Sequence, residues 1–248
     1  KLTTDEKSKI KNHYKILNEE GILIIPEYFK KLLPHLNSEF ENLVSNYSIS
    51  RGKTKYDDGK VDIGHYSISN SGLMEANLLA SAAIDAYLTR LVSYYWGKPI
   101  YLAQAGGTRL EPRDIDYDYR SMQWHHDSKH RQIKIFILLT DVAENQQCTH
   151  YISGSHKSWK SSRKESRMSE QFIHQKYQRT SYAVGKAGSV IILDTNGYHR
   201  GNRNNSARRD LMVFNYTAGK NIFPINFPKH LLQNLNYFWL NKDNLSAK

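Results

Sequence analysis

The stretch QIKIFILLTDV, residues 132–142, is rich in β-branched and aromatic residues and predicts a buried β-strand. It belongs to a series of short strand-like runs, separated by turn residues, that fills the second half of the chain. The others are IYLAQAG (100–106), SMQWHHD (121–127), THYISG (149–154), SYAVG (181–185), SVIILD (189–194) and DLMVFNYTAG (210–219). Because no helical pattern lies between these runs, they favour an antiparallel sandwich or barrel over a parallel βαβ sheet.

The first 98 residues have a different, mainly helical pattern. A capping signal at Thr3/Thr4 and Gly21 as a stop bracket a helix over about 4–18. The apolar run GILIIPEY, residues 21–28, predicts a short strand that ends at Pro26, and 28–47 returns to helical periodicity. Residues 49–72 are polar and weakly patterned and predict a loop, followed by one helix to about Tyr95.

The composition is that of a globular protein. Of 248 residues, 39% are hydrophobic and 24% charged, which excludes disordered and low-complexity classes. A single cysteine, Cys148, excludes an internal disulfide and any metal site built on several thiolates. Metal chemistry would therefore have to use histidine and carboxylate ligands.

Lysine and arginine exceed acidic residues by 35 to 24, a formal net charge of +11. The excess is spread along the chain, with one concentration in HKSWKSSRKESRMSEQFIHQKYQR, residues 156–179, which we interpret as an insertion between strands. No apolar run approaches the roughly 20 residues that span a bilayer, and the start KLTTDEKSKIKN lacks the apolar stretch of a secretory signal. We therefore expect a cytoplasmic protein without membrane contact.

Histidine and aspartate cluster at the end of one strand-like run, in WHHD, residues 124–127. Because side chains alternate along a strand, His125 and Asp127 point to one face and His126 to the other. His199 follows the second run SVIILD, 72 residues beyond Asp127. Two histidines and one carboxylate form the facial triad that holds non-haem Fe(II) and leaves coordination positions open.

Two arginines stand a few residues beyond His199. Arg208 and Arg209 precede the run DLMVFNYTAG. A guanidinium there can bind a carboxylate through two parallel hydrogen bonds, which a lysine cannot do.

These blocks together resemble the phytanoyl-CoA dioxygenase-like family of Fe(II)/2-oxoglutarate-dependent oxygenases, the branch that includes ectoine hydroxylase and natural-product hydroxylases. The resemblance rests on the order and spacing of several segments and touches most of the chain from Glu19 to Tyr216. They are EEGILIIPEYF (19–29), WHHDS (124–128), QIKIFILLTDVAEN (132–145), ISGSHKSW (152–159) and VGKAGSVIILDTNGYHRGNRNNSARRDL (184–211).

The resemblance implies a mostly β fold, the double-stranded β-helix or cupin-like jelly roll, with flanking α-helices. We expect one oxygenase domain over 1–248, with 1–98 as mainly helical support, 99–220 as the jelly-roll core and 221–248 as a C-terminal tail. It also implies Fe(II), 2-oxoglutarate as co-substrate and O2, with His125, Asp127 and His199 as the metal ligands. Because relatives that halogenate lack the carboxylate ligand, Asp127 favours hydroxylation or a related oxidation.

The family's arginine for 2-oxoglutarate usually follows the distal histidine by about eleven residues. Arg209 lies ten and Arg208 nine residues after His199. We favour Arg209 because Tyr216 then keeps the aromatic spacing of the last core strand, and Arg208 remains the alternative.

Further residues are candidates for the co-substrate or substrate. Gln104 matches a position where relatives often carry a polar side chain toward the active site. Lys134 alternates with Ile133 and Ile135, so it faces either solvent or the interior, where it would need an anionic partner. For the substrate, the candidates are Trp124, Arg109, Lys129 and His130.

The resulting hypothesis is a 2-oxoglutarate-dependent dioxygenase that oxidises an unactivated C–H bond of a small, polar or anionic molecule and releases succinate and CO2. One alternative keeps the iron chemistry but docks a nucleic acid, protein or carrier-tethered substrate on the basic segment 156–180. Another is a non-catalytic cupin-like binding protein, which requires that the triad binds no iron or that Arg208 and Arg209 both point to solvent.

Overall fold

The computed structural model describes residues 3–50, 52–55, 61–69, 72, 76–112, 120–127, 131–159, 166–202 and 207–218. Within these ranges no helix has the length and apolar character needed to cross a membrane. The expected tail at 221–248 and the substrate candidates Lys129 and His130 lie outside the described residues.

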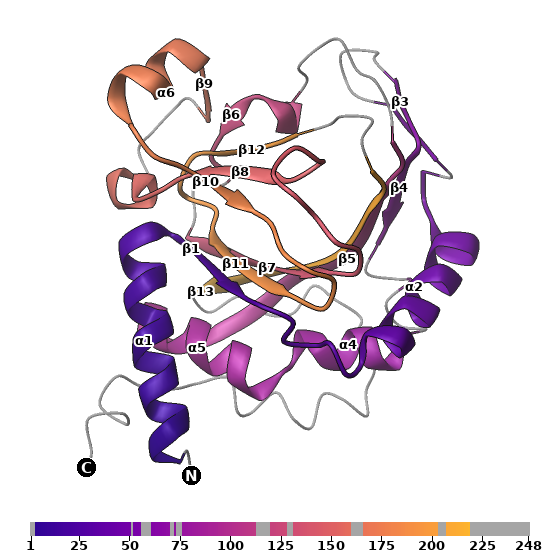
Figure 1. Ribbon diagram of the computed structural model, residues 1–248, viewed down its shortest axis with the longest axis horizontal. Helices are drawn as coiled ribbons and strands as arrows, with labels where there is room; N and C mark the ends of the chain where they lie inside the picture. The colour runs from indigo at the N-terminus through magenta and orange to yellow at the C-terminus, as the bar shows by residue number, and fades with distance from the viewer. Residues whose placement is uncertain are drawn as a thin grey trace.

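All the described α-helices except α6 gather along one side of the molecule, and α6 lies by the smaller sheet (Figure 1). A capping box between Thr3 and Glu6 starts the first helix, and Gly21, at a φ of 79°, ends it in the left-handed conformation. The described helices are α1 (Thr4–Glu20), α2 (Leu33–Tyr47), α4 (Asn77–Ala83), α5 (Ala86–Trp96) and α6 (Glu170–Lys176), with short 3-10 turns η1 (Arg120–Met122) and η2 (Ser155–Ser158).

Two antiparallel sheets form the β core. The larger has the order β1-β11-β7-β13-β5-β4 and the smaller β10-β8-β12-β6-β9. The larger sheet comprises β1 (Ile22–Ile25), β4 (His65–Ile68), β5 (Ile100–Leu110), β7 (Gln132–Leu138), β11 (Val190–Asp194) and β13 (Arg209–Ala218). The smaller comprises β6 (Trp124–His125), β8 (Thr149–Ile152), β9 (Arg167–Met168), β10 (Thr180–Ala183) and β12 (His199–Gly201). β2 (Lys53–Lys55) and β3 (Val61–Ile63) pair separately. The predicted double-stranded β-helix with flanking helices is confirmed.

The predictions for the first half need three corrections. The expected loop 49–72 contains β4, which joins the larger sheet beside β5, and β3 together with β2. The helix expected at 28–47 begins only at Leu33, with Pro34 in its first turn where its missing N–H costs nothing. The single helix expected up to Tyr95 is two helices, because the Asp85 side chain caps the start of α5.

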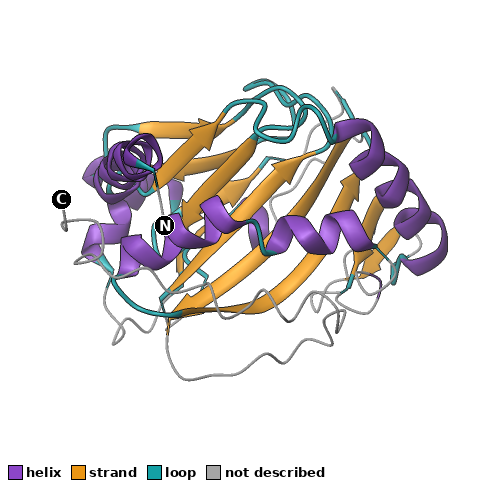
Figure 2. Cartoon of the chain, turned by 90° about the horizontal axis from the view of Figure 1, so that it is seen from below, coloured by secondary structure: helices purple, strands orange, loops and turns teal. Residues whose placement is uncertain are grey.

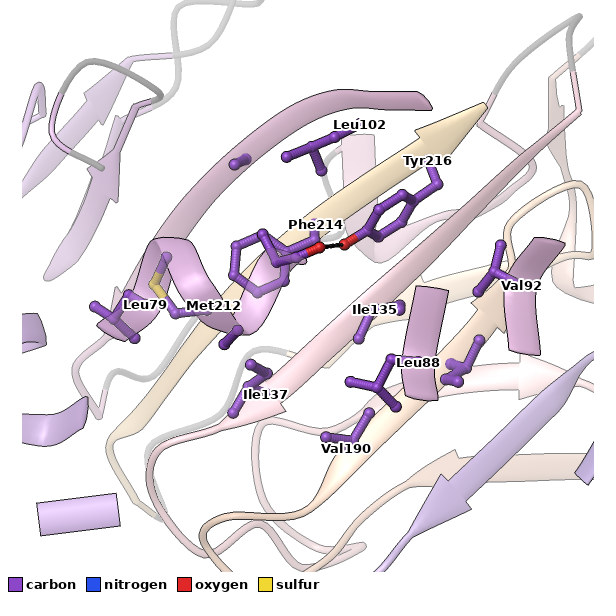
Figure 3. Packing of buried hydrophobic residues seen from close by; sticks show 14 of the residues in the cluster. Leu79, Leu88, Val92, Leu102, Ile135, Ile137, Val190, Met212, Phe214 and Tyr216 are labelled. Atoms are coloured by element: carbon purple, nitrogen blue, oxygen red, sulfur yellow. Dashed lines mark hydrogen bonds between the residues drawn. The ribbon is translucent and has the colours of Figure 1, made fainter. Parts of the chain in front are cut away.

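The main hydrophobic core lies between the larger sheet and the helices that cross it (Figure 2). Strand alternation sends Ile133, Ile135 and Ile137 of β7 toward the helices, where they meet Leu88 and Val92 of α5 (Figure 3). Phe214 and Tyr216 of β13 share this face, and the Tyr216 hydroxyl donates a hydrogen bond to the Ala83 carbonyl (Figure 3). The opposite face of the same strands is therefore turned toward the smaller sheet.

Arg109 lies on the helical side of β5 in a buried ion pair. Its side chain contacts both oxygens of Asp210, directly opposite on β13, at 2.9 and 2.7 Å. The same guanidinium reaches Glu41 of α2 at 3.0 and 2.5 Å. Arg109 is 6% exposed, so its position does not support the expectation that it contacts substrate. Because side chains alternate along β5, its neighbours Thr108 and Leu110 face the cavity side of the sheet and Arg109 faces the helices.

Replacing Arg109 by methionine should lower the free energy of unfolding by about 3 kcal/mol, because Asp210 would remain buried without its main partner. Denaturant titration of the two proteins measures this. The control is Arg208→Ala, which removes an exposed guanidinium near the same carboxylate and should cost less than about 1 kcal/mol. An Arg109→Met protein of unchanged stability would contradict the assignment.

The outer face of the smaller sheet has its own small core. Trp124, Ile152 and Tyr198 pack there against Ile173 of α6. His150 of β8 lies near this cluster, with its ring edge-to-face against Tyr182 at a centroid distance of 4.9 Å. Burial, with the nearby charge of Arg200, lowers the pKa of His150 from 6.5 to about 4.

This shift predicts a pH dependence of stability. The unfolded chain takes up a proton at His150 near pH 6.5 but the folded chain only near pH 4, so stability contributed by the neutral ring is lost as the pH falls through this window. His150→Phe should therefore lose less stability than the wild type between pH 6.5 and 4, as measured by denaturant unfolding at each pH. Equal losses in the two proteins would show that this ring is not held neutral.

Candidate metal centre

Two short paired strands bring the predicted ligands together. β6 ends at His125 and β12 begins at His199, and these two residues are direct cross-strand partners. Asp127 follows β6, where its backbone N–H donates to the Thr195 carbonyl at 3.0 Å. The Nε2 atoms of His125 and His199 lie 3.6 and 3.5 Å from Asp127 Oδ1. One ligand atom from each residue lies within 4.8 Å of the others.

The backbone fixes which histidine nitrogen faces the centre. His125 Nδ1 lies 2.7 Å from the Gln123 carbonyl, and His199 Nδ1 lies 3.0 Å from the Gly197 carbonyl. Because a carbonyl oxygen can only accept, both Nδ1 atoms carry the proton and both Nε2 lone pairs are available. An outer hydrogen bond of this kind orients a metal-binding imidazole.

The two carboxylate oxygens of Asp127 have different neighbours: Oδ1 faces the histidines, and Oδ2 accepts hydrogen bonds from neighbouring side chains. Asp127 Oδ2 accepts from Gln132 Nε2 at 3.0 Å and from Lys134 Nζ at 2.6 Å. Gln132 Oε1 in turn accepts from Asn215 Nδ2 at 3.2 Å. Lys134 therefore faces the interior and has the anionic partner that such a position requires. Oδ1 is left to bind a metal.

Lowered pKa values keep two of the ligands, Asp127 and His199, in the protonation states that bind a metal. Burial alone would raise the pKa of Asp127, but the facing histidine rings and the Lys134 ammonium outweigh it and hold this pKa well below its usual value. Burial lowers the pKa of His199 below its usual value, against the opposing charge of Asp127. At neutral pH the carboxylate is thus ionised and His199 is neutral, the forms that bind a metal.

The donor set fits non-haem iron. With bonds of about 2.1 Å, neighbouring ligand atoms of an octahedral site lie about 3 Å apart, close to the observed histidine-to-aspartate separations. Two imidazoles and one monodentate carboxylate occupy one side of such a centre. The remaining side faces a cavity between the sheets.

This cavity has a volume of about 260 Å³. Its apolar wall is formed by the inward residues of the larger sheet, including Phe136, Leu211 and Val213. Its polar side chains come from several separate segments. Its described lining residues are His65, Thr108, Leu110, Ser121, Met122, His125, Lys134, Phe136, Thr149, His199, Gly201, Asn202, Arg209, Leu211 and Val213.

Of the two candidate arginines, only Arg209 is among these lining residues. Its Nη1 group donates to the Gln147 carbonyl. Arg208 is 44% exposed and lies 3.4 Å from Asp210 and 3.8 Å from Glu41, on the helical side of β13. Alternation at the start of β13 separates them.

Two other predicted residues lie away from the cavity lining. Gln104 is exposed on β5. Trp124 is buried on the outer face of the smaller sheet, because its neighbour His125 takes the inner face. Its position does not support a contact with substrate at this cavity.

Several residues of the site were not predicted from the sequence. Gln132 lies two residues before Lys134 and must share its face, a signal that was present in the sequence. Asn215 and His65 reach the same side of the larger sheet only through strand pairing, which no local pattern shows. Tyr151 contacts the backbone next to the site: its hydroxyl donates to the Asp194 carbonyl at 2.9 Å, and its side chain packs against Gly21 and Gly197.

A jelly roll that holds two histidines and one carboxylate beside a cavity with an inward arginine is the architecture of a 2-oxoglutarate-dependent non-haem iron oxygenase. The family model for phytanoyl-CoA dioxygenase (PhyH) matches residues 17–210. The chain belongs to the phytanoyl-CoA dioxygenase family.

Solved structures share the fold at low sequence identity. The carbocyclase SnoK from nogalamycin biosynthesis, described as non-heme and alpha ketoglutarate dependent, is 16% identical, with 90% of each chain covered and a TM-score of 0.68. EctD from S. alaskensis with bound Fe is 17% identical over 92% of this chain and 83% of the other, with a TM-score of 0.67. HygX from Streptomyces hygroscopicus, with nickel and 2-oxoglutarate bound, is 17% identical over 88% of each chain, with a TM-score of 0.61. A search of curated proteins found no significant match.

Replacing His199 by alanine should abolish binding of one Mn²⁺ or Fe²⁺ ion, because only Asp127 and His125 would remain of the ligand set. Anaerobic titration followed by electron paramagnetic resonance of free Mn²⁺ measures the loss. His174→Ala, an exposed histidine on α6, is the control and should bind metal as the wild type does. Full metal affinity in the His199 variant would remove this residue from the site.

Proposed function

We propose that the protein catalyses the oxidation of an unactivated C–H bond in a small molecule, with hydroxylation as the simplest outcome. In that reaction the substrate, O2 and 2-oxoglutarate give the hydroxylated substrate, succinate and CO2. The observation that carries the proposal is the cluster of His125, Asp127 and His199, whose two histidines line the same cavity as Arg209. Iron(II) bound there would couple O2 activation to decarboxylation of 2-oxoglutarate.

Each protein group has a distinct part in this proposal. His125, Asp127 and His199 would hold the metal, while Lys134 and Gln132 keep Asp127 from binding through both oxygens. Arg209 would bind the distal carboxylate of 2-oxoglutarate, since a guanidinium matches a carboxylate in geometry and charge. Lys134 also lines the cavity and would add positive charge near the co-substrate.

The cavity suits a controlled oxidation. Phe136, Leu211 and Val213 form an apolar wall that limits the access of water to the reacting centre. Retention of Asp127 as a ligand supports hydroxylation or a related oxidation over halogenation, since halogenating relatives lack this carboxylate. The non-catalytic alternative requires that the triad binds no iron or that Arg208 and Arg209 both point to solvent. The close approach of the three ligand atoms and the position of Arg209 in the cavity lining argue against it.

The substrate is proposed to be small, polar and neutral or anionic. No Asp or Glu is among the described residues that line the cavity, whereas Lys134 and Arg209 are. His65, Ser121 and Asn202 offer hydrogen-bonding side chains from separate segments. A cationic substrate would find no carboxylate counter-charge among these described lining residues.

Anaerobic addition of Fe²⁺ and then 2-oxoglutarate should produce a weak visible charge-transfer band near ~500 nm, because a 2-oxoacid chelates a metal that has open positions. Absorption spectroscopy of the metal-loaded protein measures it, and succinate release then screens candidate substrates. Iron binding without the band would retain the metal site but exclude 2-oxoglutarate as its co-substrate.

Arg209→Ala should raise the apparent KM for 2-oxoglutarate, by about 10-fold or more, because a charge-assisted bidentate contact is lost. Steady-state succinate formation against 2-oxoglutarate concentration measures it. Arg208→Ala is the matched control and should leave this KM near the wild-type value. The reverse pattern would transfer the role to Arg208.

A further inference from the structure

Glu170 joins the two strands that carry the histidine ligands, on the face turned away from the cavity. A single carboxylate oxygen, Glu170 Oε2, accepts from Trp124 Nε1 at 2.8 Å and from Arg200 Nη1 at 2.7 Å. Trp124 precedes His125 on β6, and Arg200 follows His199 on β12. The guanidinium of Arg200 also stacks over the Trp124 ring, 4.6 Å from its centroid. We call Trp124, Glu170 and Arg200 the Glu170 clip.

Direct backbone pairing between the two strands is short. β6 has two residues and β12 three, and they share one paired position, His125 with His199. A short ladder of this kind resists sliding or splaying weakly, because few backbone hydrogen bonds cross it. Any relative movement of the strands changes the separation of the two Nε2 atoms on the inner face.

The polar groups of the clip make its geometry specific. Trp124 is 2% exposed, so its N–H would be costly to leave without an acceptor. Glu170 is the first residue of α6, which Ser169 caps, so the carboxylate is held at a defined point over the sheet. Its other oxygen, Oε1, lies 2.8 Å from Nε2 of the exposed His174.

We propose that Glu170 is a positioning residue for the metal centre, which sets the spacing of His125 and His199 from outside the cavity. This inference rests on the proposed function, because it needs these histidines to bind a metal. Outer partners of metal ligands typically contribute 10- to 100-fold to metal affinity. Glu170 acts through the neighbouring residue of each ligand, so its contribution should lie near the lower limit.

The test uses Mn²⁺ as a redox-stable probe of the full chain, with free Mn²⁺ followed by electron paramagnetic resonance. Only binding that is lost in His199→Ala counts as binding at the site. Glu170→Ala should raise the Kd for Mn²⁺ about 10-fold, and Glu170→Gln should raise it less because the amide keeps one acceptor. Trp124→Phe and Arg200→Gln each remove one arm of the clip and should each give part of the effect.

Two controls separate positioning from a general loss of stability. Asp141→Asn removes another exposed carboxylate, paired with Lys186 at 2.8 Å, and should leave the Kd unchanged. His174→Ala removes the contact to Oε1 and keeps the clip. The Tm of each metal-free variant is recorded, because a modest loss of stability does not change the affinity of the folded molecules.

The outcomes are distinguishable. A Kd for Glu170→Ala and Glu170→Gln equal to that of the wild type and of Asp141→Asn overturns the positioning role while the metal site stands. A wild-type protein that binds no more Mn²⁺ than His199→Ala overturns the metal site, and with it both proposals. If Glu170→Ala does not fold, Glu170→Gln and Trp124→Phe decide the matter.

Discussion

The larger sheet separates a helical core on one face from a cavity on the other, and the alternation of its side chains keeps the two sets of residues apart. In β7 the residues Ile133, Ile135 and Ile137 pack beneath the helices, while Lys134 and Phe136 face the cavity. The same rule separates Arg209 from Arg208 at the start of β13. A shift of one residue in register would exchange every member of the two sets, so the helical core and the metal centre depend on the same strand pairing.

The charges of the molecule follow this division. On the helical side, Arg109 is balanced by Asp210 and Glu41 and joins two strands to α2. On the cavity side, Lys134 is balanced by Asp127, which is also the metal ligand. Arg109 on β5 and Lys134 on β7, two strands that β13 separates, therefore have different consequences. Arg109 holds the strands and α2 together, and Lys134 sets the binding mode of the Asp127 carboxylate.

The sequence could predict what depends on local pattern. The strand-like runs predicted an antiparallel sandwich or barrel, and the family resemblance narrowed this to the jelly roll. The His-x-Asp pair and the position of His199 predicted a triad that the fold does bring together. What escaped prediction depends on contacts between distant segments. β4 lies in a polar stretch whose strand character comes from pairing with β5, and the outer face to which alternation sends Trp124 is covered by the distant helix α6. Arg109 and Trp124 were chosen as substrate residues for their chemistry, but alternation sends both to the other side of their strands.

Tyr151 restricts which residues two distant glycine positions can accept in evolution. Its hydroxyl fills the space where a Cβ atom would stand at either Gly21 or Gly197, two positions 176 residues apart in the chain. Gly21 ends α1, and Gly197 supplies the carbonyl that orients His199. A Cβ atom at either glycine would collide with the Tyr151 hydroxyl and displace it from the Asp194 carbonyl. Substitution of either glycine therefore requires loss of the tyrosine hydroxyl, but that loss alone would not suffice. Gly21 keeps a φ of +79° and faces His156 Nδ1, and Gly197 faces Ser155 Oγ.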